Sequence, residues 1–138
     1  MLISAVICHH KGTFVDRAVE TLLASEEVQI EVIVMTSDTE CVKRLSEKFP
    51  PVKTVFTSNE GGPAAKRNNS LQYASGEYLA FFDDDVEVDP YAVREMQRFI
   101  EAPRVGMVFG KLLNMERQEY FDEAGSFLTS FGFLWARG

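Results

Sequence analysis

The chain has 138 residues, and its 46% hydrophobic content is enough for one domain with a sizeable core. Its formal net charge of −7 argues against a protein that grips nucleic acid through the phosphates, because that contact needs clustered Lys and Arg, so small molecules or metal ions are the expected partners. The two cysteines, Cys8 and Cys41, form no spaced ligand motif, which favours free thiols in a reduced, cytoplasmic setting.

The first half of the chain alternates short apolar strands with amphipathic helices. Leu2 to Cys8 predicts a buried strand; the run is too short for a membrane span and lacks the features of a signal peptide. Thr13 is expected to cap a helix, Ile30 to Met35 predicts a second strand, and a second helix is expected from about Asp38 to Pro50-Pro51. The inward residues predicted for the two helices are Phe14, Val15, Ala18, Val19, Leu22 and Leu23, then Cys41, Val42, Leu45 and Phe49.

The second half continues the alternation. Val52 to Thr57 predicts a third strand, and Gly61-Gly62-Pro63 turns the chain into a third helix that runs to about Ser75-Gly76. Glu77 to Phe82 predicts a fourth strand that is rigid and buried, and Asp89-Pro90 opens a fourth helix. The inward residues of that helix are predicted to be Ala92, Val93, Met96, Phe99 and Ile100, and a fifth strand is expected over Val105 to Met115.

Four alternations of strand and helix are typical of a parallel sheet covered on both faces by helices. The predicted fold class is therefore α/β, a three-layer sandwich with a mostly parallel central sheet, in one domain over residues 1–138. In such sheets ligands bind beyond the carboxyl ends of the strands. After Met115 the signals weaken, and the aromatic tail from Phe127 to Trp135 is expected to find a partner, self-association included.

Three adjacent carboxylates, Asp83, Asp84 and Asp85, follow the fourth strand at this edge. They predict a site for Mn²⁺ or Mg²⁺, because these cations prefer oxygen ligands and share them with substrate phosphates. Alternating side-chain direction makes Asp83 and Asp85 the functional pair, with Asp84 pointing away as the most replaceable of the three. The alternative is structural, with one aspartate capping the next element and the others solvated in a turn.

Arg67 and Asn68 are a second candidate pair. Helical spacing places both near the core-facing stripe of the third helix, where polar groups need partners. Arg67 could pair with an aspartate, contact a nucleotide or hold the loop, and the alternative is a structural arginine that bridges helix and strand.

Four segments together resemble the inverting glycosyltransferase family two, which has the GT-A fold. They are ISAVICHHKG, EVIVMTSDTE, NEGGPAAKRNNSLQYASGEYLAFFDDDVEVDP and DEAGSFLTSFGFLWARG, in an order and spacing that agree over nearly the whole chain. The third is the most specific, since a glycine-containing loop, an Arg-Asn pair, a Gly-Glu-Tyr strand start and an Asp-X-Asp occur in one run. The resemblance implies a Rossmann-like domain for a nucleoside diphosphate sugar and transfer of a hexosyl group to a glycan or lipid hydroxyl, as in cell-wall or polysaccharide biosynthesis.

The resemblance also implies roles for single residues. Asp85 would bind the Mn²⁺ or Mg²⁺ that bridges the two phosphates, and Asp83 beside it would contact the ribose or a uridine-like moiety. Arg67 would position the nucleotide, Asp84 belongs to the same nucleotide-sugar-binding stretch, and the backbone around His9 to Gly12 would line the base pocket.

Two segments depart from the family pattern. Thr36-Ser37 stand where the family has Asp-Asp or Asp-Asn, whose first Asp reads the base, and Asp38 is the candidate substitute. His9-His10-Lys11 replaces a Thr-Tyr-Asn type sequence. The histidines are expected to be ordinary loop residues that point apart, a metal or base role being the alternative, and Lys11 is expected to reach a phosphate. All six remain candidate nucleotide-sugar-binding residues.

An inverting transferase also needs a general base, which the family carries in its later half. Asp122 and Glu123 match a stretch before that base, so the base is expected beyond residue 138 and the chain is expected to be a donor-binding portion truncated before the acceptor half. Peripheral membrane contact is expected of the full-length protein. The alternatives are a non-catalytic nucleotide-sugar-binding or assembly module and, more weakly, a nucleotidyltransferase, which needs a glycine-rich basic loop where CHHKGTF has one glycine.

Overall fold

The computed structural model describes residues 1–131 and 133–136. The chain divides into two compact units, Met1–Arg94 and Glu95–Gly138, with the boundary inside the last helix. The one-domain prediction is not decided by this division and stays a prediction.

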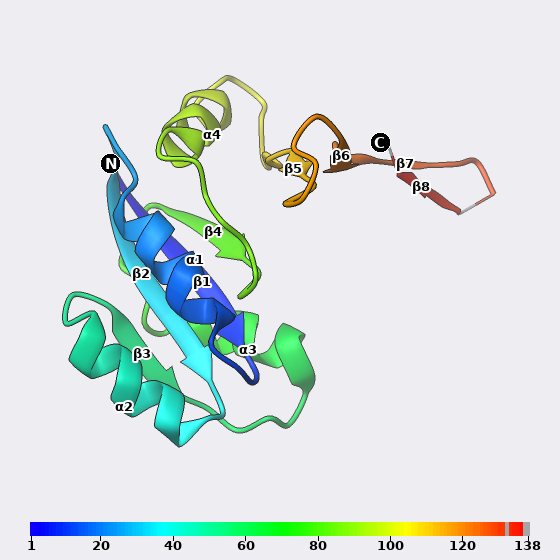
Figure 1. The fold of residues 1–138 in the computed structure, drawn as a ribbon. Helices are drawn as coiled ribbons and strands as arrows, with labels where there is room; N and C mark the ends of the chain where they lie inside the picture. The colour runs from blue at the N-terminus through cyan, green and yellow to red at the C-terminus, as the bar shows by residue number, and fades with distance from the viewer. Residues whose placement is uncertain (132, 137–138) are drawn as a thin grey trace. The chain divides into compact units, whose positions relative to one another are not determined.

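Four parallel strands form the sheet of the first unit, in the order β3-β2-β1-β4 (Figure 1). The strands are β1 Leu2–His9, β2 Gln29–Thr36, β3 Lys53–Phe56 and β4 Tyr78–Phe82; the helices are α1 Phe14–Leu23, α2 Thr39–Lys48, α3 Gly62–Ser70 and α4 Ala92–Ile100. The predicted α/β class with a mostly parallel central sheet is thus confirmed. Because β2 and β3 lie on one side of β1 and β4 on the other, the strand order switches between β1 and β4, where such sheets bind ligands.

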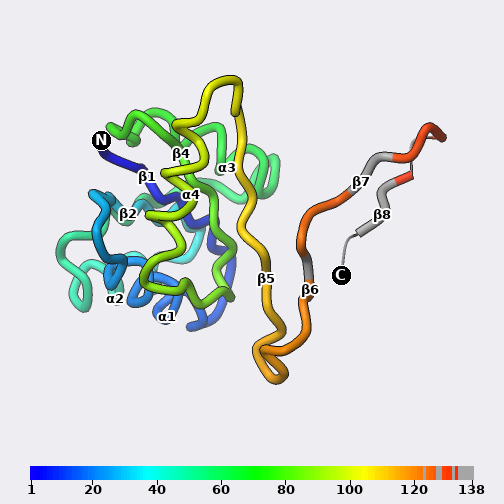
Figure 2. The backbone as a smooth tube through the Cα atoms, turned by 90° about the horizontal axis from the view of Figure 1, so that it is seen from above, coloured from blue at the N-terminus to red at the C-terminus, as the bar shows by residue number. Residues whose placement is uncertain are grey.

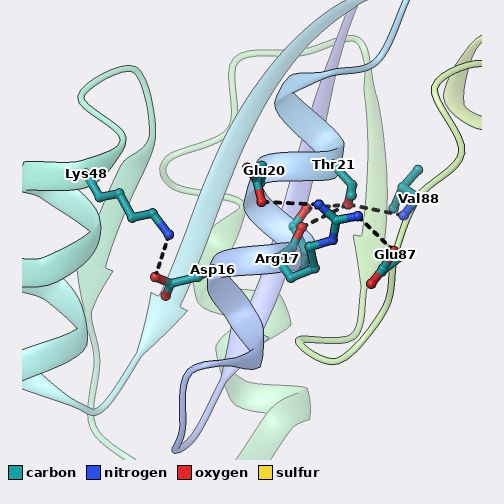
Figure 3. Close-up of polar contacts among 8 residues, drawn as sticks. Asp16, Arg17, Glu20, Thr21, Lys48, Glu87 and Val88 are labelled. Carbon is teal, nitrogen blue, oxygen red and sulfur yellow. Dashed lines mark hydrogen bonds and ion pairs between the residues drawn. The ribbon is translucent and has the colours of Figure 1, made fainter.

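Helices cover both faces of this sheet. α1 and α2 lie on one face and α3 on the other, as Figures 1 and 2 both show. The carboxylate of Asp16 ties α1 to α2, since Arg44 Nε and Lys48 Nζ each donate to it over 3.1 Å (the Lys48 contact is drawn in Figure 3). On the α3 face, Val6, Ile33 and Met35 form a fully buried cluster. The carboxyl ends of β1, β2 and β4 are therefore held at one edge of a packed core.

The helix stripes are largely those predicted. Val15, Ala18, Val19 and Leu22 of α1 are buried, as are Cys41 and Leu45 of α2. Phe14, which is 73% exposed, and Leu23 were wrongly placed inside; each lies one residue outside the buried stripe, a rotation of about 100° about the helix axis. Phe99 of α4 is also exposed, against the prediction. Thr13 stands at the N-cap of α1 but makes no side-chain capping bond.

The third helix differs from its prediction in length and in orientation. It ends at Ser70 instead of near Ser75-Gly76. Lys66 and Ser70, one turn apart, are the buried residues of the helix, whereas Arg67 is partly exposed and Asn68 is exposed. Arg67 and Asn68 were predicted near the core-facing stripe, but they follow the buried Lys66 by one and two residues, which is about 100° and 200° around the helix, so they lie outside that stripe.

Two strand predictions also fail. β4 pairs only with β1 in the first unit, and as an edge strand it leaves Leu79 and Phe81 exposed on one side, so it is not the buried strand predicted. The strand expected over Val105 to Met115 shrinks to β5, Leu112–Leu113, because an apolar run becomes a strand only where a partner supplies the ladder. The second unit pairs β5 with β6 (Phe121–Glu123) and β7 (Ser126–Leu128) with β8 (Leu134–Ala136), both antiparallel.

Other expectations concern the surroundings of the protein. Both cysteines are free. No helix among the described residues is long and apolar enough to cross a bilayer. The side chains of Phe127 and Trp135 lie outside the described part of the structure, so self-association through that tail stays a prediction, as do membrane contact and the cytoplasmic setting.

Candidate functional site

The acidic triplet begins where the β1–β4 ladder ends. The last ladder pair is Ile7 with Phe82, and Asp83 follows it directly. Exposure alternates along the triplet: the Asp83 side chain is 68% exposed, that of Asp84 is 29% exposed, and Asp85 is exposed. Asp83 and Asp85 are thus the exposed members of the triplet. The chain turns at Asp84 and Asp85, so the extended conformation on which the predicted sidedness depends does not continue, and the pairing of Asp83 with Asp85 stays a prediction.

Asp84 meets a buried histidine. Its Oδ2 lies 2.7 Å from Nδ1 of His9, whose side chain has no exposed surface. One expectation is corrected here. His9 is the last residue of β1 and not a loop residue, although it does point away from the exposed His10. Asp84 has a buried partner in His9, and its standing as the most replaceable of the three acids stays a prediction.

Asp83 faces the α3 side of the sheet. Arg67 Nη2 of α3 lies 3.5 Å from Asp83 Oδ1, and the Arg67 guanidinium lies 6.0 Å from the centre of the Phe81 ring. Arg67 thus pairs with an aspartate and bridges helix and strand, two of the four roles considered for it. Both partners are well exposed, so the pair contributes little stability and can open to admit a ligand.

Lys66 is a site residue that sequence reasoning missed. It is buried, its Nζ donates to the carbonyl of His9 over 2.7 Å, and Ser37 Oγ lies 3.4 Å from the same nitrogen. Lys66 therefore joins α3 to the carboxyl ends of β1 and β2. The sequence contains one indication of this position. Lys66 lies four residues from both Gly62 and Ser70, so it shares a helix face with them, and its long apolar stem can lie on the inner side of the helix.

A pocket of about 290 Å³, open to solvent, lies between the end of β1 and the start of α3. Its lining combines an ammonium group, an imidazole, an amide and a thiol with the first residues of a helix, where backbone N–H groups favour anions. The residues that line it are Cys8, His10, Asn59, Gly62, Pro63 and Lys66.

The cysteine in this pocket is a neutral thiol. Burial raises the pKa of Cys8, and this outweighs the lowering by the positive charges of Arg67 and Lys66. Because the thiolate is the nucleophilic and metal-binding form, Cys8 serves as packing and pocket wall at neutral pH.

Thr36 and Asp38, two of the candidate base-reading residues, take part in starting α2. Thr36 is buried and its Oγ1 accepts from the Asp38 backbone N–H over 3.1 Å. The Asp38 carboxylate accepts from the Glu40 backbone N–H over 3.0 Å, as an N-cap does. Ser37, between them, is the one that turns toward Lys66 and the pocket. Lys11 is exposed and has no polar partner among the described residues.

Replacing Asp38 by alanine is expected to lower the free energy of unfolding by about 1 kcal/mol, the usual cost of losing an N-cap. Nucleotide affinity should stay unchanged, because the carboxylate is already engaged by α2. Urea unfolding measures the first quantity and a nucleotide titration the second. A fall in affinity without a fall in stability would show that Asp38 reads the ligand.

The segment after the acids is fastened to α1 (Figure 3). Arg17 Nη2 donates to Glu87 over 3.1 Å, and Thr21 Oγ1 accepts from the Val88 N–H over 3.1 Å. Just before α4, the Asp89 side chain accepts the backbone N–H of Tyr91. The residue that caps the next element is therefore Asp89, and the alternative in which an aspartate of the triplet has this role does not hold. The triplet is thus held by β1 on one side and by α1 on the other.

Comparison with known proteins shows the family. The sequence profile of "Glycosyl transferase family 2" matches residues 4–134. The chain belongs to glycosyltransferase family 2. The acid cluster, Arg67 and the ends of β1 and β2 lie within the matched region.

The chain also matches individual members of this family at modest sequence identity. The chain is 32% identical over 76 residues to the uncharacterized glycosyltransferase YibD of Escherichia coli, covering 51% of this chain and 22% of YibD. It is 29% identical over 94 residues to the succinoglycan biosynthesis protein ExoO of Rhizobium meliloti, and 30% over 77 residues to a poly(ribitol-phosphate) beta-glucosyltransferase of Bacillus spizizenii. Those matches cover 66% and 55% of this chain, and 27% and 12% of the respective relatives. The chain therefore spans about a quarter or less of each relative's length.

Solved structures show the same fold. Residues 1–349 of TarS from S. aureus superpose with a TM-score of 0.64 at 23% identity, over 73% of this chain and 32% of that fragment. The mannosyltransferase PcManGT from Pyrobaculum calidifontis, solved in complex with GDP-Man and Mn²⁺, superposes with a TM-score of 0.64 at 16% identity, over 80% of this chain and 34% of that chain. The likeness supports the GT-A fold at the level of architecture.

Proposed function

We propose that this family 2 chain binds a nucleoside diphosphate sugar at the carboxyl edge of its sheet, with Mn²⁺ or Mg²⁺ held by Asp85 and Asp83, and takes part in transferring a hexose to a glycan or lipid hydroxyl. The observation that carries the proposal is the pair of exposed carboxylates fixed beyond β4 at the switch in strand order. The complex of PcManGT with GDP-Man and Mn²⁺ supports the choice of ligands.

The residues present fit such a cation. Asp83 and Asp85 offer carboxylate oxygens, which hard divalent ions prefer. Asp85 makes no ion pair or hydrogen bond with another described side chain, and Asp83 has only the weak contact with Arg67. No group of three described His, Cys, Asp or Glu side chains gathers into a self-sufficient metal site. Two carboxylates that share the ion with substrate phosphates are the usual arrangement for Mg²⁺, so metal and nucleotide are expected to bind together.

The remaining residues would bind and orient the donor. When bound, the divalent ion would supply positive charge to offset the charge that builds on the departing diphosphate. Arg67 would leave Asp83 and donate to the nucleotide, His10 and the backbone up to Gly12 would line the base pocket, and Lys11 is free to reach a phosphate. Lys66 holds Ser37 and the end of β1 in place and adds positive charge close to the pocket.

The test is a donor panel. The chain is incubated with Mn²⁺ and UDP-, GDP-, CDP- or dTDP-sugars, and release of the nucleoside diphosphate is measured, with Asp85→Asn as the inactive control. Release above that control supports a transferase. Binding of one donor without transfer or hydrolysis supports a non-catalytic nucleotide-sugar-binding module instead. If no donor binds with or without the metal, the proposal is wrong.

A further inference from the structure

His9 and Asp84 form a polar contact inside the edge that carries the candidate site. Nδ1 lies 2.7 Å from Asp84 Oδ2, and because a carboxylate only accepts, the imidazole donates. Nε2 is fully buried and has no hydrogen-bond partner among the described residues. The buried ring therefore has a single polar anchor, and that anchor is the middle residue of the acidic triplet.

The contact between His9 and Asp84 lies just beyond the last backbone pair of the β1–β4 ladder. β1 and β4 are paired up to Ile7 and Phe82, and the chain then leaves the strand geometry at Asp83 and turns at Asp84 and Asp85. From that point the His9 side chain takes over the attachment of the triplet to β1. His9 is itself fixed from the opposite face, because Lys66 Nζ donates to its carbonyl over 2.7 Å.

The attachment also separates Asp84 from the two outer acids. Asp84 is held inward by His9, whereas Asp83 and Asp85 on either side of it are exposed. If Asp84 were released, the turn would lose this attachment to β1, and the directions of the two outer carboxylates would be less restricted. A site that is organised before its ligand arrives binds more tightly, since less ordering remains to be done.

We propose that His9 is a positioning residue for the acid cluster. By holding Asp84, it fixes the directions of Asp83 and Asp85 and thereby sets the affinity for a divalent cation with a nucleoside diphosphate. This inference rests on the proposed function and adds to it a positioning role for a buried side chain.

The proposal is tested with three single variants and with the double variant that combines His9→Leu and Asp84→Ala. His9→Leu keeps apolar volume but removes the donor, and Asp84→Ala removes the acceptor from the other side without altering the core. His9→Asn is the rescue variant, because its amide N–H occupies nearly the same distance from the backbone as Nδ1–H. The readout is the dissociation constant of Mn²⁺ in the presence of whichever of UDP, GDP, CDP or dTDP the wild type binds. Urea unfolding without ligand reports the stability of each variant.

We expect His9→Leu and Asp84→Ala each to weaken Mn²⁺ binding about tenfold, the double variant to lose no more than either single one, and His9→Asn to stay close to the wild type. Folded His9→Leu or Asp84→Ala with unchanged Mn²⁺ affinity, even at reduced stability, would show a purely structural contact and overturn the inference alone. A wild type that binds no Mn²⁺ with any of these nucleotides would overturn the proposed function and this inference together.

Discussion

Replacing Asp85 by asparagine is expected to weaken Mn²⁺-dependent binding of a nucleoside diphosphate about tenfold or more, equivalent to about 1.4 kcal/mol. The substitution keeps the size of the side chain but removes one of the two charged oxygen ligands available to the cation. The stability of the ligand-free protein should change by less than about 0.5 kcal/mol, because Asp85 is exposed and the mutual repulsion of three adjacent acids is relieved.

Glu47→Gln is the matched control for this prediction. Glu47 is exposed on α2, and its side chain makes no ion pair or hydrogen bond with another described residue. The Glu47→Gln variant loses the same charge as Asp85→Asn without touching the acid cluster. Thermal melting with nucleotide, in Mn²⁺ and in EDTA, compares the three proteins. An Asp85→Asn protein that keeps the full metal-dependent rise in melting temperature would remove Asp85 from the site.

Acid is expected to destabilise the first unit through Glu31, at the opposite edge of the sheet from the acid cluster. Its carboxylate accepts from Lys53 Nζ (2.7 Å), Ser4 Oγ (2.6 Å) and the backbone N–H of Ser75 (2.6 Å), and its side chain is only 15% exposed. Burial alone raises the pKa of Glu31, but hydrogen bonds from Lys53, Ser4 and Ser75 together outweigh it and lower the pKa to about 2.

The sign of the pH effect follows from this lowered pKa. In the folded state the Glu31 carboxylate takes up a proton only near pH 2, whereas in the unfolded chain it does so near the ordinary value of 4.5. The stabilisation of the folded state by charged Glu31 is therefore present above about pH 5 and is lost as the pH falls from about 5 to 2. The full contribution amounts to about 3 kcal/mol. Glu31→Gln should therefore be less stable than the wild type at pH 7 by about this amount, and the gap should narrow by more than half at pH 3.

Urea unfolding of both proteins between pH 7 and pH 3 measures this gap. Glu47→Gln again serves as the control, because an exposed, unpaired carboxylate should show little difference from the wild type at any pH in the range. A gap between Glu31→Gln and the wild type that is the same at every pH would mean that the effect comes from packing and not from the charge of Glu31.

The same region explains a motif that sequence alone could only note. Gly76, the start of the Gly-Glu-Tyr segment, donates its backbone N–H to Ser4 Oγ over 2.8 Å. A Cβ atom at this position would come within 2.6 Å of the Ser4 backbone nitrogen and 2.8 Å of the Leu2 carbonyl oxygen. Glycine is thus required by the close approach of the chain to β1 as it enters β4.

Sequence patterns correctly predicted the helices and strands whose buried side can be read from the periodicity of their own apolar residues. The apolar runs of β1 and β2 and the stripe of Val15, Ala18, Val19 and Leu22 identify their buried sides without knowledge of the rest of the fold. The run from Val105 to Met115 looked equally apolar, yet only Leu112 and Leu113 find a ladder. Strand formation depends on a partner elsewhere in the chain, and periodicity contains no information about that partner.

The site was predicted less completely for a related reason. Asp83 and Asp85 were chosen because a continuing strand would place them on one side, and Arg67 because of its place on the helix after the glycine turn; their roles stay predictions. Lys66, His9 and the holding role of Asp84 depend on the register between β1 and β4 and on the rotation of α3, which bring the three residues to one edge. Patterns of hydrophobic and polar residues place a lysine on the surface. The apolar stem of Lys66 can nevertheless be buried, because its ammonium group donates a hydrogen bond to a backbone carbonyl.

The central claim is that nucleotide and divalent cation bind this chain together at Asp83 and Asp85. Isothermal titration calorimetry of UDP, GDP, CDP and dTDP into the protein, once with Mn²⁺ and once with EDTA, tests it most directly. We expect that at least one nucleotide binds with Mn²⁺, that its affinity falls about tenfold or more in EDTA, and that Mn²⁺ alone binds weakly. Equal affinity with Mn²⁺ and with EDTA would contradict it.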